Sequence, residues 1–213
     1  MSSQNRTPYQ PSIITHLRNL MPDRPLGFAE GLTVAELQAA RLLEFSQVTE
    51  PAVPNLVIAD LPRVHVTYRD NLPMSGFAQW ESGRWTIAVN RSESPLRQRF
   101  SLAHEFKHVL DHATIAHAYP ATNTATSEEI AERVCDYFAA CLLMPKAWVK
   151  SSYCYEGVQD IASLARRFAV SPAAMRYRLT QLGLIEPVQR HRRYQRALPQ
   201  MSALSLSMLG VAA

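Results

Sequence analysis

Five consecutive residues, His104 to His108, combine the residue types and the spacing that metal-assisted hydrolysis needs: His-Glu-Phe-Lys-His. Two histidines four residues apart on a helix lie on one face, about 6 Å apart along its axis, so both imidazoles can bind one divalent ion. Glu105 then lies beside the ion, where a carboxylate can take a proton from water and pass it to a leaving amine. We expect Zn2+ here, with Mn2+ as second candidate, because zinc lowers the pKa of water to roughly 7.

A catalytic zinc site takes three protein ligands, so the pattern needs a third. Glu132 is predicted to supply it, because it lies on the next predicted helix with Asp136 four residues later on the same face. In such an arrangement the glutamate binds the metal, and the aspartate accepts the outward N–H of a ligating histidine and fixes its tautomer. Glu128 and Glu129 are rival ligands, although acids in a first helical turn commonly serve capping and the helix dipole.

Other readings of these residues give no such site. His112 extends the histidine series, but it lies roughly 12 Å along the axis from His104, too far to share an ion, so we interpret it as a cation at the helix end. The pentapeptide would also fit an ordinary polar stripe on a helix. The three cysteines show no C-x-x-C spacing, and we expect Cys135 and Cys141 to be small buried residues on a helix rather than zinc ligands.

Two capped helices are predicted to position these side chains. Ser94-Pro95 gives an N-cap followed by proline at the first helical position, and apolar residues recur at helical spacing from there to about His112. Thr126 to Glu129 forms a capping box for a second helix, which ends before Pro145. Both halves of the candidate site therefore lie on regular elements.

A small sheet is predicted before these helices. Residues 64–68 alternate as in a strand, and the runs 76–80 and 85–90 flank a hairpin turn in which Gly83 supplies a positive φ. We expect residues 85–90 to form an exposed edge that pairs with an extended polypeptide, although a merely structural hairpin is an alternative. An earlier amphipathic helix over residues 33–48 is predicted to begin with a capping box of Thr33 and Glu36.

Three segments, Trp85 to Asn90, Arg99 to Glu105 and Glu132 to Pro145, together resemble the ImmA/IrrE family of metallopeptidases. The resemblance covers about residues 64–185, and its specific part pairs A-H-E-x-x-H with a downstream E-x-x-[small]-[Asn/Asp]-x-F-A-A-x-L-L-M-P. Cys135 stands where an alanine is usual, and Asp136 where an asparagine is usual. Lys107 replaces a common glycine, which should be harmless if Lys107 faces solvent.

The resemblance implies an α+β fold. Its zincin-like core would contain a small mixed sheet and the H-E-x-x-H active-site helix, followed by a helix-turn-helix-like extension at the C-terminus. It also implies a protein substrate, because members of the family cleave a helix-turn-helix transcriptional repressor in a bacterial stress, DNA-damage or mobile-element response.

The C-terminal third reads as helix, tight turn and helix over residues 160–182, with Ser171-Pro172 opening the second helix. One interpretation makes this a DNA-reading motif with Arg176 and Arg178 on the recognition helix, joined on phosphates by arginines of the tail: Arg190, Arg192, Arg193 and Arg196. The other interpretation, which we favour, is a helical pair packed on the core through an apolar face: Leu164, Phe168, Val170, Met175, Leu179 and Leu182.

The whole chain sets few limits. It has 213 residues, 47% of them hydrophobic, and a net charge of +4, which permits but does not require an acidic partner. We divide it into a loosely ordered segment (1–30), a metallopeptidase core (31–155), the helical extension (156–185) and a basic, then apolar tail (186–213). No stretch is long and apolar enough to span a bilayer, and the start lacks the apolar block of a secretory signal, so we expect a cytoplasmic protein without membrane contact.

The sequence thus predicts a zinc-dependent endopeptidase in which Glu105 is the catalytic base, His104, His108 and Glu132 bind the metal, and Asp136 supports one of the two ligating histidines. The alternative is a DNA-binding transcriptional regulator with a structural or vestigial metal site. The group that stabilises the oxyanion stays open among several residues able to do so: His117, Tyr119, Tyr137, Tyr153 and Tyr155.

Overall fold

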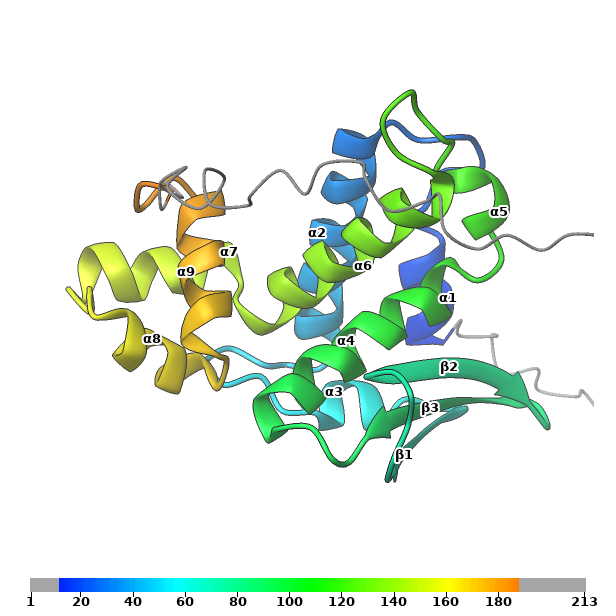
Figure 1. Ribbon diagram of the computed structural model, residues 1–213, viewed down its shortest axis with the longest axis horizontal. Coiled ribbons are helices and arrows are strands. Elements are labelled where there is room, and N and C mark those ends of the chain that lie inside the picture. Colours follow the sequence, from blue (N-terminus) through cyan, green and yellow to red (C-terminus); the bar gives the residue numbers. More distant parts are fainter. Residues whose placement is uncertain (1–11, 188–213) are drawn as a thin grey trace, which may run out of the picture.

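The computed structural model describes residues 12–187, so residues 1–11 and the tail arginines from Arg190 onward lie outside the described part. Figure 1 shows the arrangement of its helices and strands. In chain order these elements are α1 (Ile13–Arg18), α2 (Phe28–Phe45), α3 (Leu56–Ala59), β1 (Val64–Arg69), β2 (Gly76–Glu81), β3 (Arg84–Asn90), α4 (Pro95–Asp111), α5 (Ile115–Ala118), α6 (Ser127–Leu143), α7 (Lys146–Lys150), a π-helical turn η1 (Ser151–Tyr155), α8 (Ile161–Phe168) and α9 (Pro172–Gln181).

The three strands form one mixed sheet in the order β1-β3-β2, with β1 parallel and β2 antiparallel to β3. The hairpin between β2 and β3 turns through Ser82 and Gly83, which both have positive φ, as a two-residue turn with the twist of the strands requires. The predicted positive φ of Gly83 and the mixed α+β class are confirmed.

The predicted edge strand was wrong. β3, which holds Trp85 to Asn90, lies in the middle of the sheet and pairs on both sides, so its backbone groups are already hydrogen-bonded. The two edges of the sheet are β1 and β2, and β2 is the edge strand that pairs antiparallel with β3. Strand order is fixed by long-range packing, which the local pattern of β3 does not contain.

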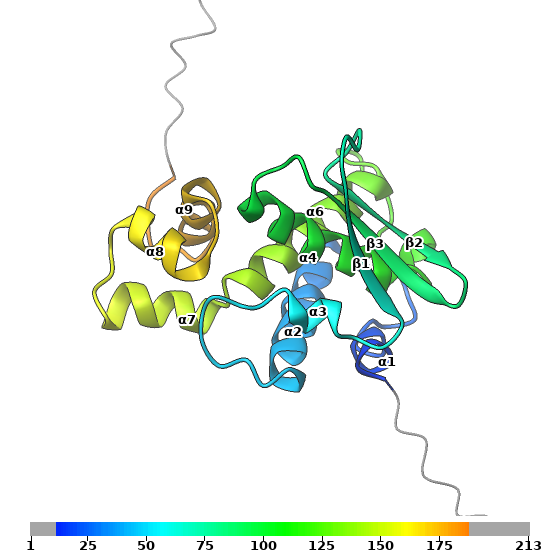
Figure 2. The same cartoon turned by 90° about the horizontal axis from the view of Figure 1, so that it is seen from below.

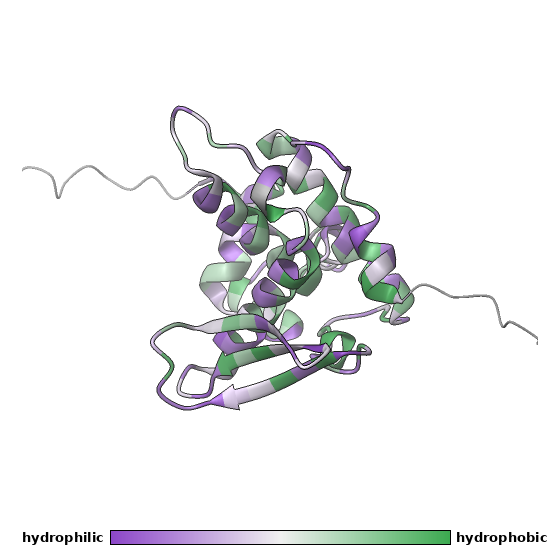
Figure 3. Cartoon of the chain, turned by 90° about the vertical axis from the view of Figure 1, so that its right-hand side faces the viewer, coloured by the Kyte–Doolittle hydropathy of each residue, from purple (hydrophilic) through white to green (hydrophobic). Residues whose placement is uncertain are grey.

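The central helices α4 and α6 begin and end as predicted. Ser94 caps α4 by accepting a hydrogen bond from the Arg97 N–H, and Thr126 and Glu129 form both hydrogen bonds of the capping box of α6. Figure 1 shows α4 between the sheet and α6, with α2 packed on the other side of α6. Figure 3 shows hydrophobic and hydrophilic residues interspersed along the helices and strands, as expected when each element buries one face.

The N-terminal part differs from the prediction. Residues 12–30 are not a loose lead-in, because Leu17 and Leu26 are buried and the Gln38 side chain donates a hydrogen bond to the Leu17 carbonyl. Helix α2 begins at Phe28, ahead of the predicted start, so the proposed capping box at Thr33 was wrong. The Thr33 hydroxyl instead donates to the Ala29 carbonyl inside the helix.

The C-terminal helices α8 and α9 form the predicted helix, turn and helix beside the rest of the chain (Figure 2). Ala169 ends α8 in the left-handed conformation, and Ser171 caps α9. Their apolar face is buried, as the packing interpretation requires: Leu164, Phe168, Val170, Met175 and Leu179. Arg178 is 1% exposed and donates a hydrogen bond to the Met144 carbonyl, so the interpretation of Arg178 as a DNA contact was wrong.

No helix among residues 12–187 is long and apolar enough to cross a bilayer.

Candidate metal centre

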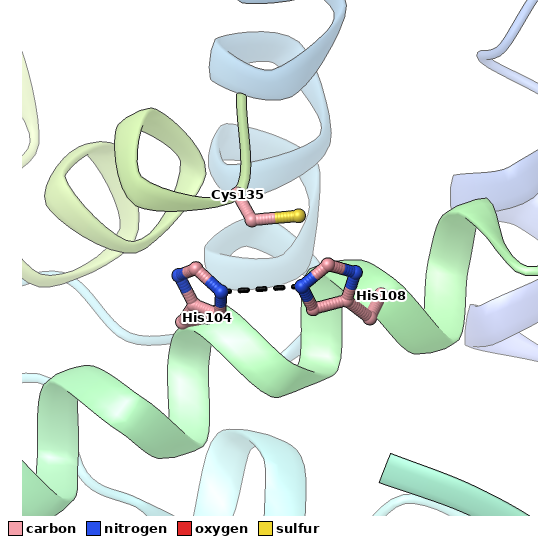
Figure 4. Close-up of side chains that lie close together, drawn as sticks. All are labelled: His104, His108 and Cys135. Carbon is pink, nitrogen blue, oxygen red and sulfur yellow. Dashed lines mark hydrogen bonds between the residues drawn. The ribbon is translucent and has the colours of Figure 1, made fainter. Parts of the chain in front are cut away.

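Helix α4 places His104 and His108 side by side on the face turned toward α6. Their Nε2 atoms lie 3.1 Å apart, and both rings are half-buried (Figure 4). The helix holds them there because its opposite face is anchored in the core by Leu102, Phe106 and Val109. Each ring thus directs one nitrogen at the same point between the two helices.

Glu132 of α6 completes the group from the facing helix. Its two carboxylate oxygens lie 3.3 Å from His104 Nε2 and 3.2 Å from His108 Nε2. Ligand atoms bound tetrahedrally at roughly 2.0 to 2.1 Å lie about 3.3 to 3.4 Å from one another, so the observed spacings fit one zinc ion. The donor set of two imidazoles and one carboxylate also fits zinc, and it leaves a fourth position free for catalysis.

The rival carboxylates stand differently. The Glu129 carboxylate accepts the hydrogen bond of the Thr126 backbone N–H in the capping box, so it is engaged at the start of α6. Glu128 lines the cleft in front of the histidines, but no contact of its carboxylate with either ring is observed among the described residues. Glu132 is therefore the carboxylate that the fold brings to the histidine pair.

Asp136 lies one turn beyond Glu132 and contacts the back of the first histidine. Its Oδ1 is 2.9 Å from His104 Nδ1. When Nδ1 carries the proton, its N–H donates a hydrogen bond to the Asp136 carboxylate. The free lone pair of the His104 ring then lies on Nε2, the atom that faces Glu132 and His108. The position of Asp136 is therefore suited to orienting the ring and to favouring the tautomer whose Nε2 can bind a metal.

A thiol competes with Glu132 for the histidine pair. The Cys135 sulfur and one nitrogen each of His104 and His108 all lie within 4.8 Å of one another, and Cys135 approaches from α6 in Figure 4. Burial raises the pKa of the Cys135 thiol well above its usual range, which disfavours the thiolate that binds metals. We therefore favour Glu132 as ligand. The spacing of Glu132 and Cys135, three residues apart on one helix face, is the sequence signal for this neighbour.

Glu105 lies in the same cleft, and burial raises the pKa of its carboxyl, assisted by the charge of Glu132 and opposed by that of His104. A carboxyl with a raised pKa holds and releases a proton nearer to neutral pH. In the metal-free protein, burial lowers the pKa of His108, whereas for His104 the hydrogen bond to Asp136 and the nearby carboxylates outweigh burial and raise the pKa.

Gly76 is a residue that the motif analysis missed. A Cβ at this position would lie 3.1 Å from Glu105 Cγ and 2.9 Å from the Ala88 carbonyl oxygen. Glycine therefore allows the edge strand β2 to approach both Glu105 and β3. A glycine at the start of a strand often marks such a close backbone approach, and this signal was present in the sequence.

A cleft of about 700 Å³ runs across the histidines, lined by β2 residues on one side and α4 and α6 on the other. None of the residues predicted as oxyanion donors lines it: His117, Tyr119, Tyr137, Tyr153 and Tyr155. Apart from His104 and His108, the described residues of the cleft whose side chains can donate a hydrogen bond include Arg97, Ser101 and His112. His112 caps α4, and its ring meets Trp85 edge-on at 4.8 Å between centroids.

Lys107, which was expected to be harmless in place of glycine if it faced solvent, does not face solvent. Its side chain is fully buried, its Nζ lies 2.5 Å from Asp111 Oδ1, and the Tyr119 hydroxyl donates to Asp111 Oδ2 at 2.6 Å. Burial and the adjacent Asp111 raise the pKa of Tyr119. Its hydroxyl therefore stays protonated and acts as the donor in the hydrogen bond to Asp111. This cluster links α4, the helix that carries the histidine pair, to Tyr119 in the segment after α5.

Comparison with known proteins agrees with this geometry. The profile of the family described as "IrrE N-terminal-like domain" matches residues 60–180, more than half of the chain. The chain belongs to the ImmA/IrrE family. The match spans the sheet, α4, α6 and nearly all of α9, so it includes every residue of the candidate site.

Two relatives carry the name radiation response metalloprotease IrrE. The one from Deinococcus radiodurans is 27% identical over 156 residues, which are 67% of this chain and 45% of the relative. The one from Deinococcus deserti is 33% identical over 100 residues, 45% of this chain and 36% of the relative. The chain thus spans less than half the length of these relatives.

Among solved structures, a Mycobacterium tuberculosis transcriptional regulator superposes with a TM-score of 0.54 at 20% identity, over 85% of this chain and 54% of that one. At this identity the likeness concerns the fold alone. ImmA/IrrE membership therefore rests on the sequence match over residues 60–180.

Proposed function

We propose that this ImmA/IrrE member is a zinc-dependent endopeptidase with a zincin-like core, in which His104, His108 and Glu132 hold the metal. The observation that carries the proposal is the meeting of two Nε2 atoms and two carboxylate oxygens at 3.1 to 3.3 Å, next to a half-buried glutamate. Zinc at such a site supplies Lewis acidity, which polarises a carbonyl and makes water a stronger acid.

Glu105 is the proton carrier in this proposal. Its carboxylate takes the proton of the attacking water and then delivers it to the nitrogen of the leaving amine, so the group returns to its starting state after each turnover. The raised pKa suits both steps, because a more basic carboxylate takes the proton of water more readily and holds it until the leaving amine accepts it. Asp136 keeps His104 in the tautomer that binds metal.

The edge strand β2 supports a polypeptide as substrate rather than a small molecule. Gly76, Phe77 and Ala78 line the cleft, and the outer part of β2 is exposed to solvent. Since β2 pairs with β3 on one side only, its other side can receive an extended chain by backbone hydrogen bonds. A polypeptide held there would pass across the histidine pair.

The substrate class follows from the family. We propose a helix-turn-helix transcriptional repressor in the cytoplasm, cleaved in a stress, DNA-damage or mobile-element response, and the radiation-response role in the names of both Deinococcus relatives supports the stress setting. Manganese is the second candidate metal. A DNA-binding regulator with an inactive metal site is less well supported, because Arg178 is buried in the core.

The test uses the full chain loaded with zinc or manganese, candidate repressors as substrates, and Glu105→Gln as the matched inactive variant. We expect cleavage by the wild-type protein and a loss of about 10²- to 10⁴-fold in kcat for Glu105→Gln, with unchanged metal content, because only the proton carrier is removed. Mass spectrometry of the products and elemental analysis of the protein give both readings. Equal cleavage by both proteins would refute the role of Glu105, and DNA binding without any cleavage would favour the regulator.

A further inference from the structure

A second hollow, of about 550 Å³, lies beside the cleft that contains His104, His108 and Glu132, which we call the metal cleft. Helices α2, α4, α6 and α9 all contribute to its wall, which is mostly apolar and includes Phe28, Leu32, Phe100, Ala140, Met144 and Tyr177. Close-packed protein interiors leave few voids larger than a water molecule, whereas binding pockets for organic ligands measure roughly 300 to 1,000 Å³. The size and lining are therefore those of a binding pocket.

The pocket adjoins the cleft at the histidine pair. Arg97, Phe100 and Asp136 line both hollows, and Asp136 is the residue that contacts His104. The ring of Phe100 lies 6.5 Å from the ring of His104, measured between centroids. A polypeptide that crosses the histidine pair therefore passes the pocket opening within a few residues of the bond to be cut.

Charge at the opening limits what can enter. Arg97 and Arg133 both line the pocket and are exposed, and the Arg133 guanidinium lies over the Phe28 ring at 4.2 Å. Arg97 also donates to the Ser75 hydroxyl and lies 3.8 Å from Glu93, so it is partly compensated, while Asp136 adds one negative charge. A partner with a carboxylate next to an apolar group complements this rim.

The opening also exposes apolar side chains. Tyr177 of α9 is 64% exposed and Leu96 of α4 is 37% exposed, and both belong to the wall. Exposed apolar residues gathered around a hollow are typical of a site that a partner covers. Helix α9 thus contributes a wall of the pocket.

We propose that this pocket is the specificity pocket of the peptidase: it binds a large apolar side chain of the substrate polypeptide, such as Phe, Trp, Leu or Met, next to an acidic substrate residue that pairs with Arg133. The inference rests on the proposed function, since it assigns the substrate sequence that the cleft accepts.

The test blocks the pocket from α9, away from the metal. Ala174 is half-buried and lines the pocket, whereas Ala173 beside it is exposed and does not, so Ala174→Trp and Ala173→Trp form a matched pair. The probe is a library of peptides from a digested proteome, incubated with the zinc-loaded full chain and read by mass spectrometry. Melting temperature and metal content check each variant, and Ala174→Met serves as a smaller block if Ala174→Trp unfolds.

We expect cleavage sites of the wild-type protein and of Ala173→Trp to share a large apolar residue at one fixed position. For peptides with that residue, Ala174→Trp should lose about 10- to 100-fold in kcat/KM, while peptides without it, which the wild-type protein cuts only slowly, should be cut by Ala174→Trp at that same slow rate. Arg133→Glu should replace the preference for an acidic neighbour by one for a basic neighbour.

Cleavage without a fixed apolar position, or an Ala174→Trp protein with the wild-type preference, would overturn the specificity pocket and leave the peptidase intact. A wild-type protein that cuts no peptide in the library and no repressor would overturn both the pocket and the proposed function.

Discussion

Glu105 and Gly76 illustrate how single residues set the chemistry of the cleft. Glu105 belongs to the local H-E-x-x-H motif, so its position directly after His104 is enough to predict its role as the general base. Gly76 lies 29 positions earlier on β2 and becomes relevant only because the fold brings its backbone to Glu105. Such a contact depends on the packing of a strand against a helix, so the motif alone does not reveal it.

Replacing Gly76 by alanine should impair catalysis more than metal binding. The new methyl group would displace Glu105 or β2 by a few tenths of an ångström, and misplacement of a proton carrier lowers kcat, here by about 10- to 100-fold. Metal content should stay stoichiometric, because the atoms nearest to the added Cβ belong to Ala88 and Glu105 and not to a histidine. Gly27→Ala is the control, since Gly27 has nothing within 4 Å of its added Cβ. Equal kcat for Gly76→Ala and wild type would contradict the positioning role.

Lys107 carries a second residue-scale prediction. Lys107→Met leaves the Asp111 carboxylate buried without its cation, and breaking a buried pair in this way costs about 3 to 5 kcal/mol. The free energy of unfolding, measured by urea denaturation, should fall by that amount. The double variant Lys107→Met/Asp111→Leu should recover part of the loss, because no uncompensated charge remains. A single variant as stable as wild type would show that the pair contributes nothing to folding.

At the scale of elements, helices α4 and α6 were predictable because their signals are local. Ser94-Pro95 and the Thr126–Glu129 box mark their starts, and their capping hydrogen bonds form as predicted. The position of β3 in the middle of the sheet was not predictable, because strand order depends on contacts between segments far apart in the chain. The early start of α2 at Phe28 was missed for a similar reason: Gly27 makes no side-chain cap, so the boundary carries no local signature.

Helix α6 presents Glu132 and Cys135 to the histidines, and metal binding distinguishes them. We expect Glu132→Ala to lower zinc affinity by at least about 10- to 100-fold, and Glu128→Ala to leave it near the wild-type value. Isothermal titration with a competing chelator measures both. The cobalt-substituted protein should show no near-ultraviolet charge-transfer band from a cobalt–sulfur bond. A strong band that disappears in Cys135→Ala would assign the third ligand to the thiol.

At the scale of the whole molecule, the cleft depends on parts of the chain that carry no motif. Leu17 and Leu26 are buried ahead of the metal helices, and α9 reaches back to the end of α6 through the buried Arg178. The periodic apolar face of α8 and α9 predicted that they pack on the core, but the role of Arg178 in that packing was not readable from its residue type. Arginine is mostly a surface residue, and its burial here depends on partners that the fold brings to it: the Met144 carbonyl, the Gln181 side chain and the Tyr137 ring.

The site and the fold together predict where the metal lies, and anomalous diffraction at the zinc absorption edge locates it in crystals of the zinc-loaded chain. We predict a single strong peak between α4 and α6, roughly 2.0 to 2.2 Å from His104 Nε2, His108 Nε2 and a carboxylate oxygen of Glu132. A peak bonded to the Cys135 sulfur with Glu132 turned away, or no peak at the histidine pair, would contradict the proposed centre.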